Sequence, residues 1–345
     1  MRWLPTKVKP PQKSLEMTKV KNSNYTLLRS AQKKLAHNLD TLEITSDFFL
    51  TKSHESLYRS TLQKHNTISK LIQLIDVTRP ERKKLYWKTY HCKNVLLQDG
   101  NKFIGSLCRK RWCQTCNRIK TAEMTNAYKE PILNLGSVYF VTLTRPNVEA
   151  RQLKSEVKKL VKAFQRIKDN LRKNHKVKLT GMRKIEITYN KELNTYHPHF
   201  HFIQQGYHEA QMLQKYWLKQ FPTANLKAQN IKEITTEDDS SLIELFKYAT
   251  KQITKDATDA KAEDIIYRAL EGMRIYQTYG KLKKVVSPKE EKEEINSADF
   301  IPSQNEIWVY DNELKDYTNA QNQPLINTIE IEQKILISCA TISSS

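Results

Sequence analysis

The sequence predicts an α+β protein in which a central antiparallel sheet is flanked by helices. Residues 137–147 ("SVYFVTLTRPN") are rich in β-branched and aromatic side chains and end in a turn signal, as buried strands do. A strongly amphipathic helix is expected directly after them, over 153–171. Two segments that alternate polar and apolar residues follow, at 182–190 and 197–204. The order strand, helix, strand, strand is typical of a mixed domain with antiparallel pairing.

Three segments have the apolar spacing of helices. Residues 56–76 show it imperfectly, whereas residues 240–253 ("SSLIELFKYATKQI") separate into an apolar and a polar side. The helix over 153–171 has the clearest apolar stripe and a basic outer side. That stripe consists of Leu153, Val157, Leu160, Val161, Phe164, Ile167 and Leu171.

Size and composition exclude several classes of protein. The chain has 345 residues and a mass of 40.5 kDa, which allows a full core and one to three domains. It has seven glycines and neither a GxxxxGK[S/T] nor a GxGxxG motif, so we expect no ATP-driven motor. No apolar run reaches the length of a membrane span, and residues 1–14 lack the apolar core of a signal peptide. We therefore expect a cytoplasmic protein without a membrane partner, whose five cysteines stay reduced.

The charge of the chain indicates a polyanionic partner. The net charge is +21, from 58 Lys and Arg against 37 Asp and Glu. Between Arg151 and Lys184 there are thirteen Lys or Arg and only two acids, which favours salt-sensitive binding of nucleic acid. In this region Lys158 and Lys162 are candidate DNA contacts. The alternative is a solvated basic face of a soluble protein, and charge alone does not distinguish DNA from RNA.

Three histidines at every second position suggest a metal site. His197, His199 and His201 share one face of the strand expected at 197–204, while the phenylalanines between them face the core. In the preceding strand Glu186 lies on a face with Lys184 and Thr188. If Glu186 pairs directly with His199, the hairpin closes over residues 191–194, an ordinary loop length.

Glu186, His199 and His201 would then form a centre with mixed nitrogen and oxygen ligands. Such a centre suits Mg²⁺ or Mn²⁺ near a phosphate. His197 is the weakest candidate ligand because it lies at the turn end of its strand. The alternative is a surface strand with polar histidines and a solvated glutamate.

The helix over 240–253 carries a candidate nucleophile on its polar side. Glu244 and Tyr248 are four residues apart and therefore neighbours on that face, with Lys247 and Lys251 beside them. Nearby positive charge favours the phenolate, which can attack phosphorus, and a glutamate one turn away can accept a proton or activate water. The alternative is a surface tyrosine whose ring covers apolar surface.

Four of the five cysteines have the spacing of a structural zinc site. Cys92, Cys108, Cys113 and Cys116 form C-x15-C-x4-C-x2-C, and the final CxxC pair resembles a zinc knuckle. Cys92 is the least certain ligand, and His91 could replace it. The alternatives for the set are free thiols and an accidental CxxC. The interleaved basic residues, including Arg109 and Arg111, suit DNA contact, whereas Cys339 is interpreted as incidental.

The motifs together resemble one enzyme superfamily. "VTLT", "E…HPHFHF" and "ELFKYATK", in this order, resemble the HUH endonucleases, and more closely the replication initiators (Rep proteins) of rolling-circle plasmids of Gram-positive bacteria. "CRKRWCQTC" and "ALEGMRIYQTYGKLK" fit one branch of that family, although relatives usually have proline at or near Gln114. The resemblance covers roughly residues 80–285 and implies an HUH-type domain with a cysteine-rich, zinc-binding segment.

The resemblance implies a mechanism and a domain plan. It implies that Tyr248 attacks single-stranded or hairpin origin DNA at a metal-polarised phosphate, leaving a 5′-phosphotyrosine and a free 3′-hydroxyl. A host polymerase then extends that hydroxyl, a host helicase unwinds the plasmid, and Glu244 takes part in termination. Composition adds the two ends to this plan: a basic, partly helical region is expected at 1–80 and an acidic, flexible tail at 286–345. Between them lie the cysteine-rich segment at 81–130 and the nuclease domain at 131–285 that the resemblance implies.

Two other interpretations remain open at this point. One is a different HUH nuclease, either a relaxase or a single-tyrosine transposase. Relaxases usually place the tyrosine ahead of the histidines, and such transposases are typically much shorter and lack the upstream cysteines. The other is a non-catalytic, zinc-containing protein that binds nucleic acid, which would leave Glu186, the histidine pair and the tyrosine helix unexplained.

Overall fold

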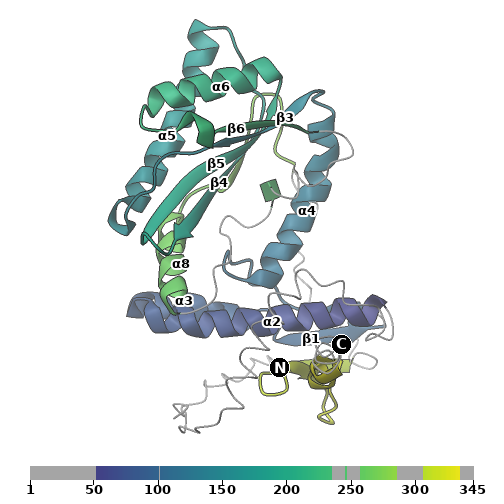
Figure 1. The fold of residues 1–345 in the computed structure, drawn as a ribbon. Coiled ribbons are helices and arrows are strands. Elements are labelled where there is room, and N and C mark those ends of the chain that lie inside the picture. The colour runs from purple at the N-terminus through teal and green to yellow at the C-terminus, as the bar shows by residue number, and fades with distance from the viewer. Residues whose placement is uncertain (1–51, 101, 235–244, 247–256, 286–305, 335–345) are drawn as a thin grey trace, which may run out of the picture. The chain divides into compact units, whose positions relative to one another are not determined.

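The computed structural model describes residues 52–100, 102–234, 245–246, 257–285 and 306–334. The chain divides into two compact units, one of residues Met1–Glu55 with Ile329–Ser345 and the other of residues Ser56–Thr328. Nearly all of the described residues belong to the second unit, which contains both β-sheets (Figure 1).

A five-stranded antiparallel sheet forms the centre of this unit, in the order β6-β3-β5-β4-β7. Its strands are β3 (Val138–Leu143), β4 (Gly181–Asn190), β5 (Thr195–Gln205), β6 (Asn230–Ile234) and β7 (Tyr276–Tyr279). The three strands expected from the sequence become β3, β4 and β5, which lie side by side in the middle of the sheet. The predicted α+β class with a central antiparallel sheet is confirmed.

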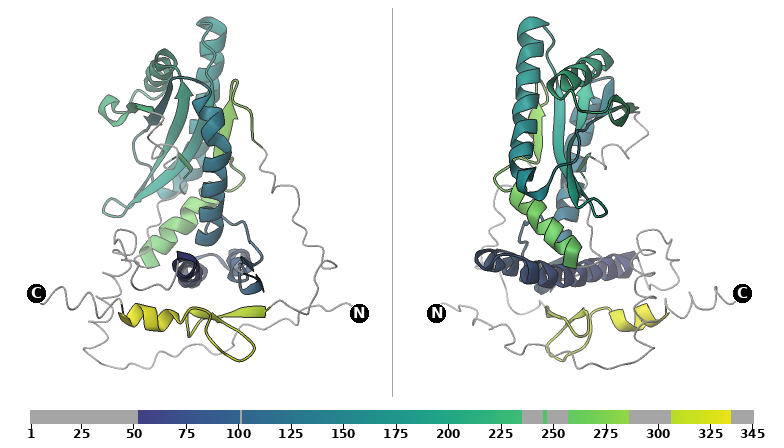
Figure 2. Two further views of the ribbon diagram at one scale, coloured as in Figure 1. Left: turned by 90° about the vertical axis from the view of Figure 1, so that its right-hand side faces the viewer. Right: turned by 60° about the vertical axis from the view of Figure 1, so that its left-hand side comes forward.

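One face of the sheet packs against helices. These are α5 (Ala150–Asn174), α6 (Tyr207–Gln220) and α8 (Ala257–Ala269). Phe200 and Phe202 of β5 are fully buried there, in one cluster with Phe164 of α5 and Trp217 of α6. Figure 2 shows α5 running alongside the strands. The apolar stripe of α5 is therefore buried against the sheet, as its spacing predicts, and the basic side of the helix faces solvent.

The opposite face of the sheet is only partly apolar. Helix α4 (Gln114–Leu133) packs on it through Tyr128 and Ile132, which cluster with Phe140 of β3, Ile203 of β5 and Phe246. Because side chains alternate along a strand, this face also carries the even-numbered residues of β4 and the odd-numbered residues of β5. The candidate metal ligands therefore lie on the α4 side of the sheet.

Two more helices join α8 through buried polar contacts. α2 (Lys52–Val77) and α3 (Pro80–Tyr90) cluster with Tyr267 of α8. The hydroxyls of Tyr86 and Thr78 donate to Asp264 of α8, at 2.7 and 2.8 Å. A short 3₁₀ helix, η2 (Leu226–Ala228), precedes β6. None of the described helices is both long and apolar enough to cross a membrane.

A second, four-stranded antiparallel sheet has the order β2-β1-β8-β9. It contains β1 (Val95–Asp99), β2 (Lys102–Ile104), β8 (Glu306–Asp311) and β9 (Asp316–Thr318). The last two strands fall in the part of the chain expected to be a flexible tail. They form because Trp308 and Tyr310 alternate with outward residues and bury against Leu96 and Tyr317. The domain boundaries drawn from the sequence stay predictions.

Candidate active site

The β4–β5 hairpin brings the candidate metal ligands together. Glu186 pairs directly with His199, and the last pair, Asn190 with Thr195, leaves residues 191–194 as the loop. The Asn190 side chain accepts a hydrogen bond from the Leu193 backbone N–H at 2.9 Å, which stabilises the turn. The register expected from the sequence is confirmed.

Three donor atoms converge on one point of this hairpin. Nε2 of His199 lies 3.1 Å from Nε2 of His201, and the latter lies 3.4 Å from Oε2 of Glu186. One ligand atom from each of the three residues lies within 4.8 Å of the other two. Adjacent ligands of an octahedral Mg²⁺, at about 2.1 Å from the ion, are about 3.0 Å apart, so the spacing fits such an ion.

Hydrogen bonds orient the two imidazoles for this role. Nδ1 of His199 lies 3.1 Å from the backbone oxygen of His197, and because a carbonyl only accepts, Nδ1 carries the proton. Nε2 of the neutral ring then keeps its lone pair. Burial and the neighbouring His201 lower the pKa of His199 to about 3, which keeps that ring neutral. Nδ1 of His201 is held by the Thr142 hydroxyl at 3.1 Å.

Glu186 remains ionised although it is buried. Burial alone would raise its pKa, but the hydrogen bond to His201 and the charge of Lys184 hold the pKa well below its usual range. Nζ of Lys184 lies 2.7 Å from Oε2 of Glu186, and the lysine side chain is fully buried. Sequence reasoning placed Lys184 on this face without giving it a role. Its position two residues before Glu186 was the available signal.

His197 lies apart from this group. Its Nδ1 is 2.8 Å from Oδ1 of Asn147, in the turn after β3, and it is not one of the residues whose ligand atoms converge. The turn end of the strand was the reason for ranking it last among the three histidines, and the geometry agrees with that ranking.

The segment that precedes the candidate nucleophile is anchored beside this centre. The backbone oxygen of Phe246 accepts hydrogen bonds from the Thr121 hydroxyl at 2.8 Å and from the Tyr276 hydroxyl at 3.1 Å. Phe246 is buried in the same cluster as Phe140, whose ring stacks on His201 at 5.2 Å. The predicted site residues Glu244, Lys247, Tyr248 and Lys251 lie outside the described residues.

Four cysteine sulfurs form a second candidate metal centre. Sγ of Cys92 lies 3.4 Å from Sγ of Cys116 and 3.6 Å from that of Cys113, and the Cys108 and Cys116 sulfurs are 3.7 Å apart. A tetrahedral zinc with Zn–S bonds of about 2.3 Å separates its sulfurs by about 3.8 Å, so the spacing fits this ion. The group contains Cys92, the ligand that the spacing left least certain.

The surroundings of these sulfurs lower the pKa of Cys92 and Cys108 but raise that of Cys113 and Cys116. Backbone N–H groups of Cys108 and Arg109 donate to the sulfurs of Cys92 and Cys116, at 3.4 and 3.2 Å. A hydrogen bond from Cys113 lowers the pKa of Cys108, and the bond to Cys108 raises the pKa of Cys113 in turn. Four thiols this close cannot all ionise without a cation between them, which is the situation that a structural zinc resolves.

Lys64 is a contact of this centre that the sequence did not indicate. Its Nζ donates to the backbone oxygens of Tyr90 and Cys92, at 2.5 and 2.8 Å. Burial lowers the pKa of Lys64 to about 8, although the charge of the cysteines, Cys92 first, opposes the shift. Lys64 lies in α2, 28 residues before Cys92, and no spacing rule connects the two.

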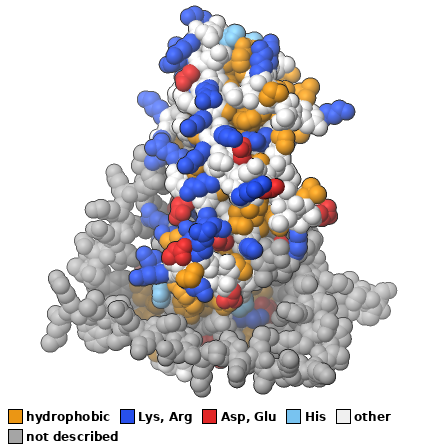
Figure 3. Space-filling model, turned by 90° about the vertical axis from the view of Figure 1, so that its left-hand side faces the viewer, with side chains coloured by type: hydrophobic (Ala, Val, Ile, Leu, Met, Phe, Trp, Pro, Cys, Tyr) orange, Lys and Arg blue, Asp and Glu red, His pale blue; other side chains and the backbone are white. Residues whose placement is uncertain are grey.

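The candidate DNA contacts fall on two surfaces. Lys158 and Lys162 are exposed on the outer side of α5, and Figure 3 shows Lys and Arg gathered along that side. Arg109 is exposed in the turn between the cysteines. Arg111 has a structural contact as well, because its guanidinium donates to the backbone oxygens of Leu270 and Met273, at 2.6 and 2.7 Å.

Comparison with known proteins finds one family. The family model described as "Replication protein" matches residues 101–323, which is more than half of the chain. The protein named "Protein rep" of Streptococcus pneumoniae is 26% identical over 56% of this chain and 66% of that relative. Proteins of the same name from Staphylococcus aureus and Lactiplantibacillus plantarum are 27% and 26% identical, over 45% and 56% of this chain and 74% and 69% of theirs. The chain thus spans about two thirds of the S. pneumoniae relative, and no solved structure matches it.

Proposed function

This chain belongs to the replication protein family, and from that premise we propose that it initiates rolling-circle plasmid replication by nicking one DNA strand at the origin. The observation that carries the proposal is the convergence of Glu186, His199 and His201 on the same sheet face as Phe246. A non-catalytic DNA-binding protein has no use for two imidazoles and an ionised, buried carboxylate at one point.

Glu186, His199 and His201 would hold a divalent cation such as Mg²⁺ or Mn²⁺. When bound, it would supply the positive charge that polarises the scissile phosphate. The hydrogen bond from Nδ1 of His199 to the His197 carbonyl keeps Nε2 available as a ligand. The hydrogen bond to His201 and the charge of Lys184 keep Glu186 ionised. Lys184 and the His197 carbonyl therefore keep the charge of Glu186 and the orientation of His199 unchanged while the phosphodiester bond is broken.

Tyr248 is the proposed nucleophile. Its phenolate oxygen forms a bond to phosphorus, the 3′-oxygen of the preceding nucleotide leaves and takes up a proton, and a 5′-phosphotyrosine remains. Lys247 and Lys251 favour the phenolate and bind backbone phosphates nearby. The free 3′-hydroxyl is the primer for a host polymerase, and because the chain has no P-loop motif, a host helicase unwinds the duplex.

Glu244 is the proposed general base for termination. After one round it takes a proton from water, so that the displaced strand is cut a second time. The new 3′-hydroxyl then attacks the phosphotyrosine and releases a closed circle, which restores the Tyr248 phenol. A phosphotyrosine conserves the energy of the broken phosphodiester, so this sequence of steps needs no ATP. All of them take place on plasmid DNA, in the bacterial cytoplasm.

The cysteine centre has a structural role in this proposal. Cys92, Cys108, Cys113 and Cys116 would hold Zn²⁺ in a closed four-sulfur site, with no open position for a substrate. The site begins helix α4, since Cys113 is the N-cap of that helix and Cys116 lies in its first turn. Zinc would therefore fix the helix that covers part of the sheet face next to the candidate active site.

An adduct assay tests the proposed chemistry. Labelled single-stranded oligonucleotides that carry candidate plasmid origin hairpins are incubated with the protein and Mn²⁺, and covalent adducts are separated by denaturing gel. We expect an adduct with the wild type and with Tyr207→Phe, an exposed tyrosine that serves as the matched control. The adduct should disappear with Tyr248→Phe and with chelator. If the wild type binds these DNAs and never forms an adduct, the nuclease proposal fails and the binding-protein interpretation replaces it.

A further inference from the structure

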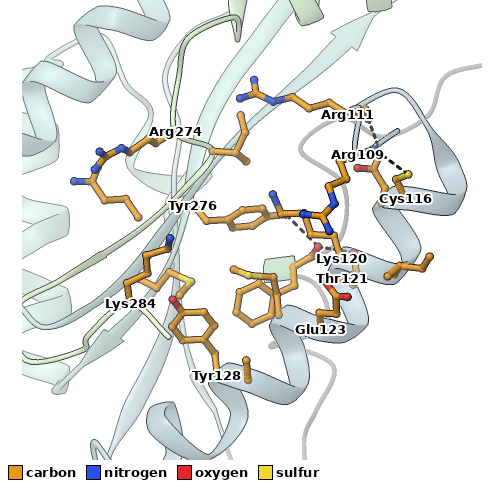
Figure 4. Close-up of a pocket in the computed structure, with 18 of the residues that line it drawn as sticks. Arg109, Arg111, Cys116, Lys120, Thr121, Glu123, Tyr128, Arg274, Tyr276 and Lys284 are labelled. Carbon is orange, nitrogen blue, oxygen red and sulfur yellow. Dashed lines mark hydrogen bonds between the residues drawn. The ribbon is translucent and has the colours of Figure 1, made fainter. Parts of the chain in front are cut away.

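A groove runs between helix α4, strand β7 and the turn at residues 107–113, here called the cysteine turn. Its volume is about 700 Å³. One wall is built from residues 107–128, the turn that carries the cysteines and the first turns of α4, and the other from residues 267–285. Figure 4 shows Arg109 and Lys120 extending from the first wall toward the ring of Tyr276 on the second.

The lining of this groove is strongly cationic. Among the residues that the structure describes, this lining contains six basic residues and one acid, Glu123. The basic residues are Arg109, Lys110, Arg111, Lys120, Arg274 and Lys284. They come from both walls, so a chain lying between the walls would have positive charge on each side. This arrangement suits a polyanionic strand, whose phosphates repeat along its length.

The floor of the groove is apolar and partly aromatic. Tyr276 and Met124 are partly exposed there, and Tyr128 and Met182 are buried beneath them. Nζ of Lys120 lies 6.0 Å from the centre of the Tyr276 ring. Aromatic and thioether side chains offer flat, apolar contact to unpaired bases, whereas a duplex presents its phosphates outward and hides the faces of its bases. The floor therefore favours a single strand over a duplex.

Contacts between the walls hold the groove in shape. The guanidinium of Arg111 joins the cysteine turn to the backbone oxygens of Leu270 and Met273. On the floor, Thr121 of α4 and Tyr276 of β7 both donate to the backbone oxygen of Phe246. A groove whose walls are already joined loses little conformational entropy when a ligand binds.

The groove lies on the same face of the sheet as the candidate active site. Met182 lies on β4, on the same face as Glu186 and four residues before it, which is about 13 Å along the strand. Phe246, which also lines the groove, stands two residues before Tyr248 in the sequence. A strand that leaves the groove at Met182 therefore has about 13 Å to run along the same sheet face before it reaches Glu186, His199 and His201.

We propose that this groove holds the single-stranded DNA on one side of the scissile phosphate. Arg109 and Lys120 bind phosphates, the Tyr276 side of the floor contacts bases, and Arg111 positions the wall without contacting the strand. The inference rests on the proposed function for its choice of DNA as the ligand. It adds a binding path that neither the histidine motif nor the tyrosine helix contains.

The salt dependence of binding tests the groove separately from the chemistry. The probe is a fluorescein-labelled dT20, and its affinity is measured by anisotropy between 50 and 300 mM NaCl, without added divalent metal. Each phosphate contact to a single strand contributes about 0.7 to the slope of log K against log salt. We expect Arg109→Gln/Lys120→Gln to make the slope shallower by about 1.4. The control Lys102→Gln/Arg118→Gln removes two exposed charges that do not line the groove and should keep the slope.

Crosslinking gives a second readout that does not depend on a variant. A dT20 with single 4-thiothymidines, irradiated on the wild type, should label peptides within 107–128 and 273–285. The groove proposal would be wrong if crosslinks were confined to the outer side of α5. It would also be wrong if Arg109→Gln/Lys120→Gln changed the salt slope no more than the control does. Equal competition by an unlabelled duplex of the same length would overturn the choice of a single strand. If one of these results contradicted the groove but the Tyr248 adduct formed normally, the nuclease proposal would stand. If the strand bound in the groove but no adduct formed, the groove would stand and the nuclease proposal would fail.

Discussion

At the scale of single residues, the candidate active site depends on an ion pair that lies almost entirely out of solvent. Lys184 is fully buried and Glu186 is 2% exposed, with 2.7 Å between Nζ and Oε2. Removing one partner of a buried pair leaves the other charge poorly compensated, and this commonly costs about 3 kcal/mol or more. The Glu186 carboxylate is also the oxygen donor of the proposed metal centre. Replacing both charges of the pair therefore tests metal binding without leaving an unpaired buried charge.

We expect Glu186→Gln to lower the free energy of unfolding by about 3 kcal/mol and to abolish tight Mn²⁺ binding. Lys184→Met/Glu186→Gln should recover most of the stability, because a side chain of similar length replaces the buried charge, but it should not recover Mn²⁺ binding. Urea unfolding and the electron paramagnetic resonance signal of free Mn²⁺ measure the two effects. If Glu186→Gln were as stable as the wild type, the Lys184–Glu186 ion pair would contribute nothing to the free energy of unfolding.

Glu156 links helix α5 to the turn after β3 and gives a dependence of stability on pH. Burial opposes its ionisation, but Lys159, at 2.8 Å, and Arg145 outweigh burial and lower its pKa below the usual value. A carboxyl with a lowered pKa in the folded state stabilises the fold above about pH 4.5 and loses that contribution as the pH falls further.

We expect Glu156→Gln to destabilise the protein by about 1 kcal/mol at pH 7 and by progressively less as the pH drops below 4.5. Urea unfolding at pH 7, 4.5 and 3.5 compares the variant with the wild type. Glu123→Gln, a substitution outside this contact, should show no such convergence. If the difference between wild type and Glu156→Gln stayed constant across these pH values, the ion pairs would not be responsible.

At the scale of elements, the cysteine turn determines where helix α4 begins. Its sulfurs accept backbone N–H groups, and Cys113 and Cys116 open the helix. Arg109 in the same turn adopts a φ of 52°, a left-handed conformation that a side chain rarely takes unless its surroundings impose it. A metal bound by the four thiolates would supply that constraint, and the groove wall would depend on it.

We expect about one zinc per chain by elemental analysis, falling to a small fraction in Cys113→Ser, while the control Cys339→Ser keeps its zinc. Amide hydrogen exchange in the peptide 108–117 should become faster in Cys113→Ser, because the N–H···S bonds are lost with the metal. Affinity for dT20 should fall in parallel. A wild type purified without zinc, and unchanged when zinc is added, would contradict this prediction.

At the scale of the whole molecule, positive charge is distributed over two surfaces with different proposed roles. The groove is narrow and has an apolar floor, which suits an unpaired strand, whereas the outer side of α5 carries exposed lysines one turn apart without a floor of this kind. Charge presented on a helix surface binds duplex phosphates without reading bases. We therefore assign duplex binding to α5.

We expect Lys158→Gln/Lys162→Gln to make the salt slope of duplex binding shallower by about 1.8, since each duplex phosphate contact contributes about 0.9. The control Lys84→Gln/Lys88→Gln removes two exposed charges at the same spacing on α3 and should leave the slope unchanged. Anisotropy with a labelled 20-base-pair duplex measures both. Equal slopes in the two double variants would rule out α5 as the duplex surface.

The sequence by itself determined those features that depend on residues close together in the chain. The period of two in "MRKIEITYN" and "HPHFHFIQ", with a four-residue loop between them, determined the register that places Glu186 opposite His199. The apolar stripe of 153–171 determined which side of α5 is buried, and the order of its motifs indicated the family. The C-x15-C-x4-C-x2-C spacing predicted a cluster of four cysteines, although only the last three of them are close in sequence.

The tertiary structure alone decided the contacts between segments that are far apart in the chain. Cys92 completes the sulfur cluster across 16 residues, and Lys64 reaches it from α2. Arg111 forms a groove wall with residues about 160 positions later, and β8 pairs with β1 across more than 200. No local period encodes such pairings, because they follow from which apolar faces pack together once helices and strands exist. The local pattern therefore specified the candidate metal ligands, and the packing of distant elements created the groove that is proposed to hold the DNA.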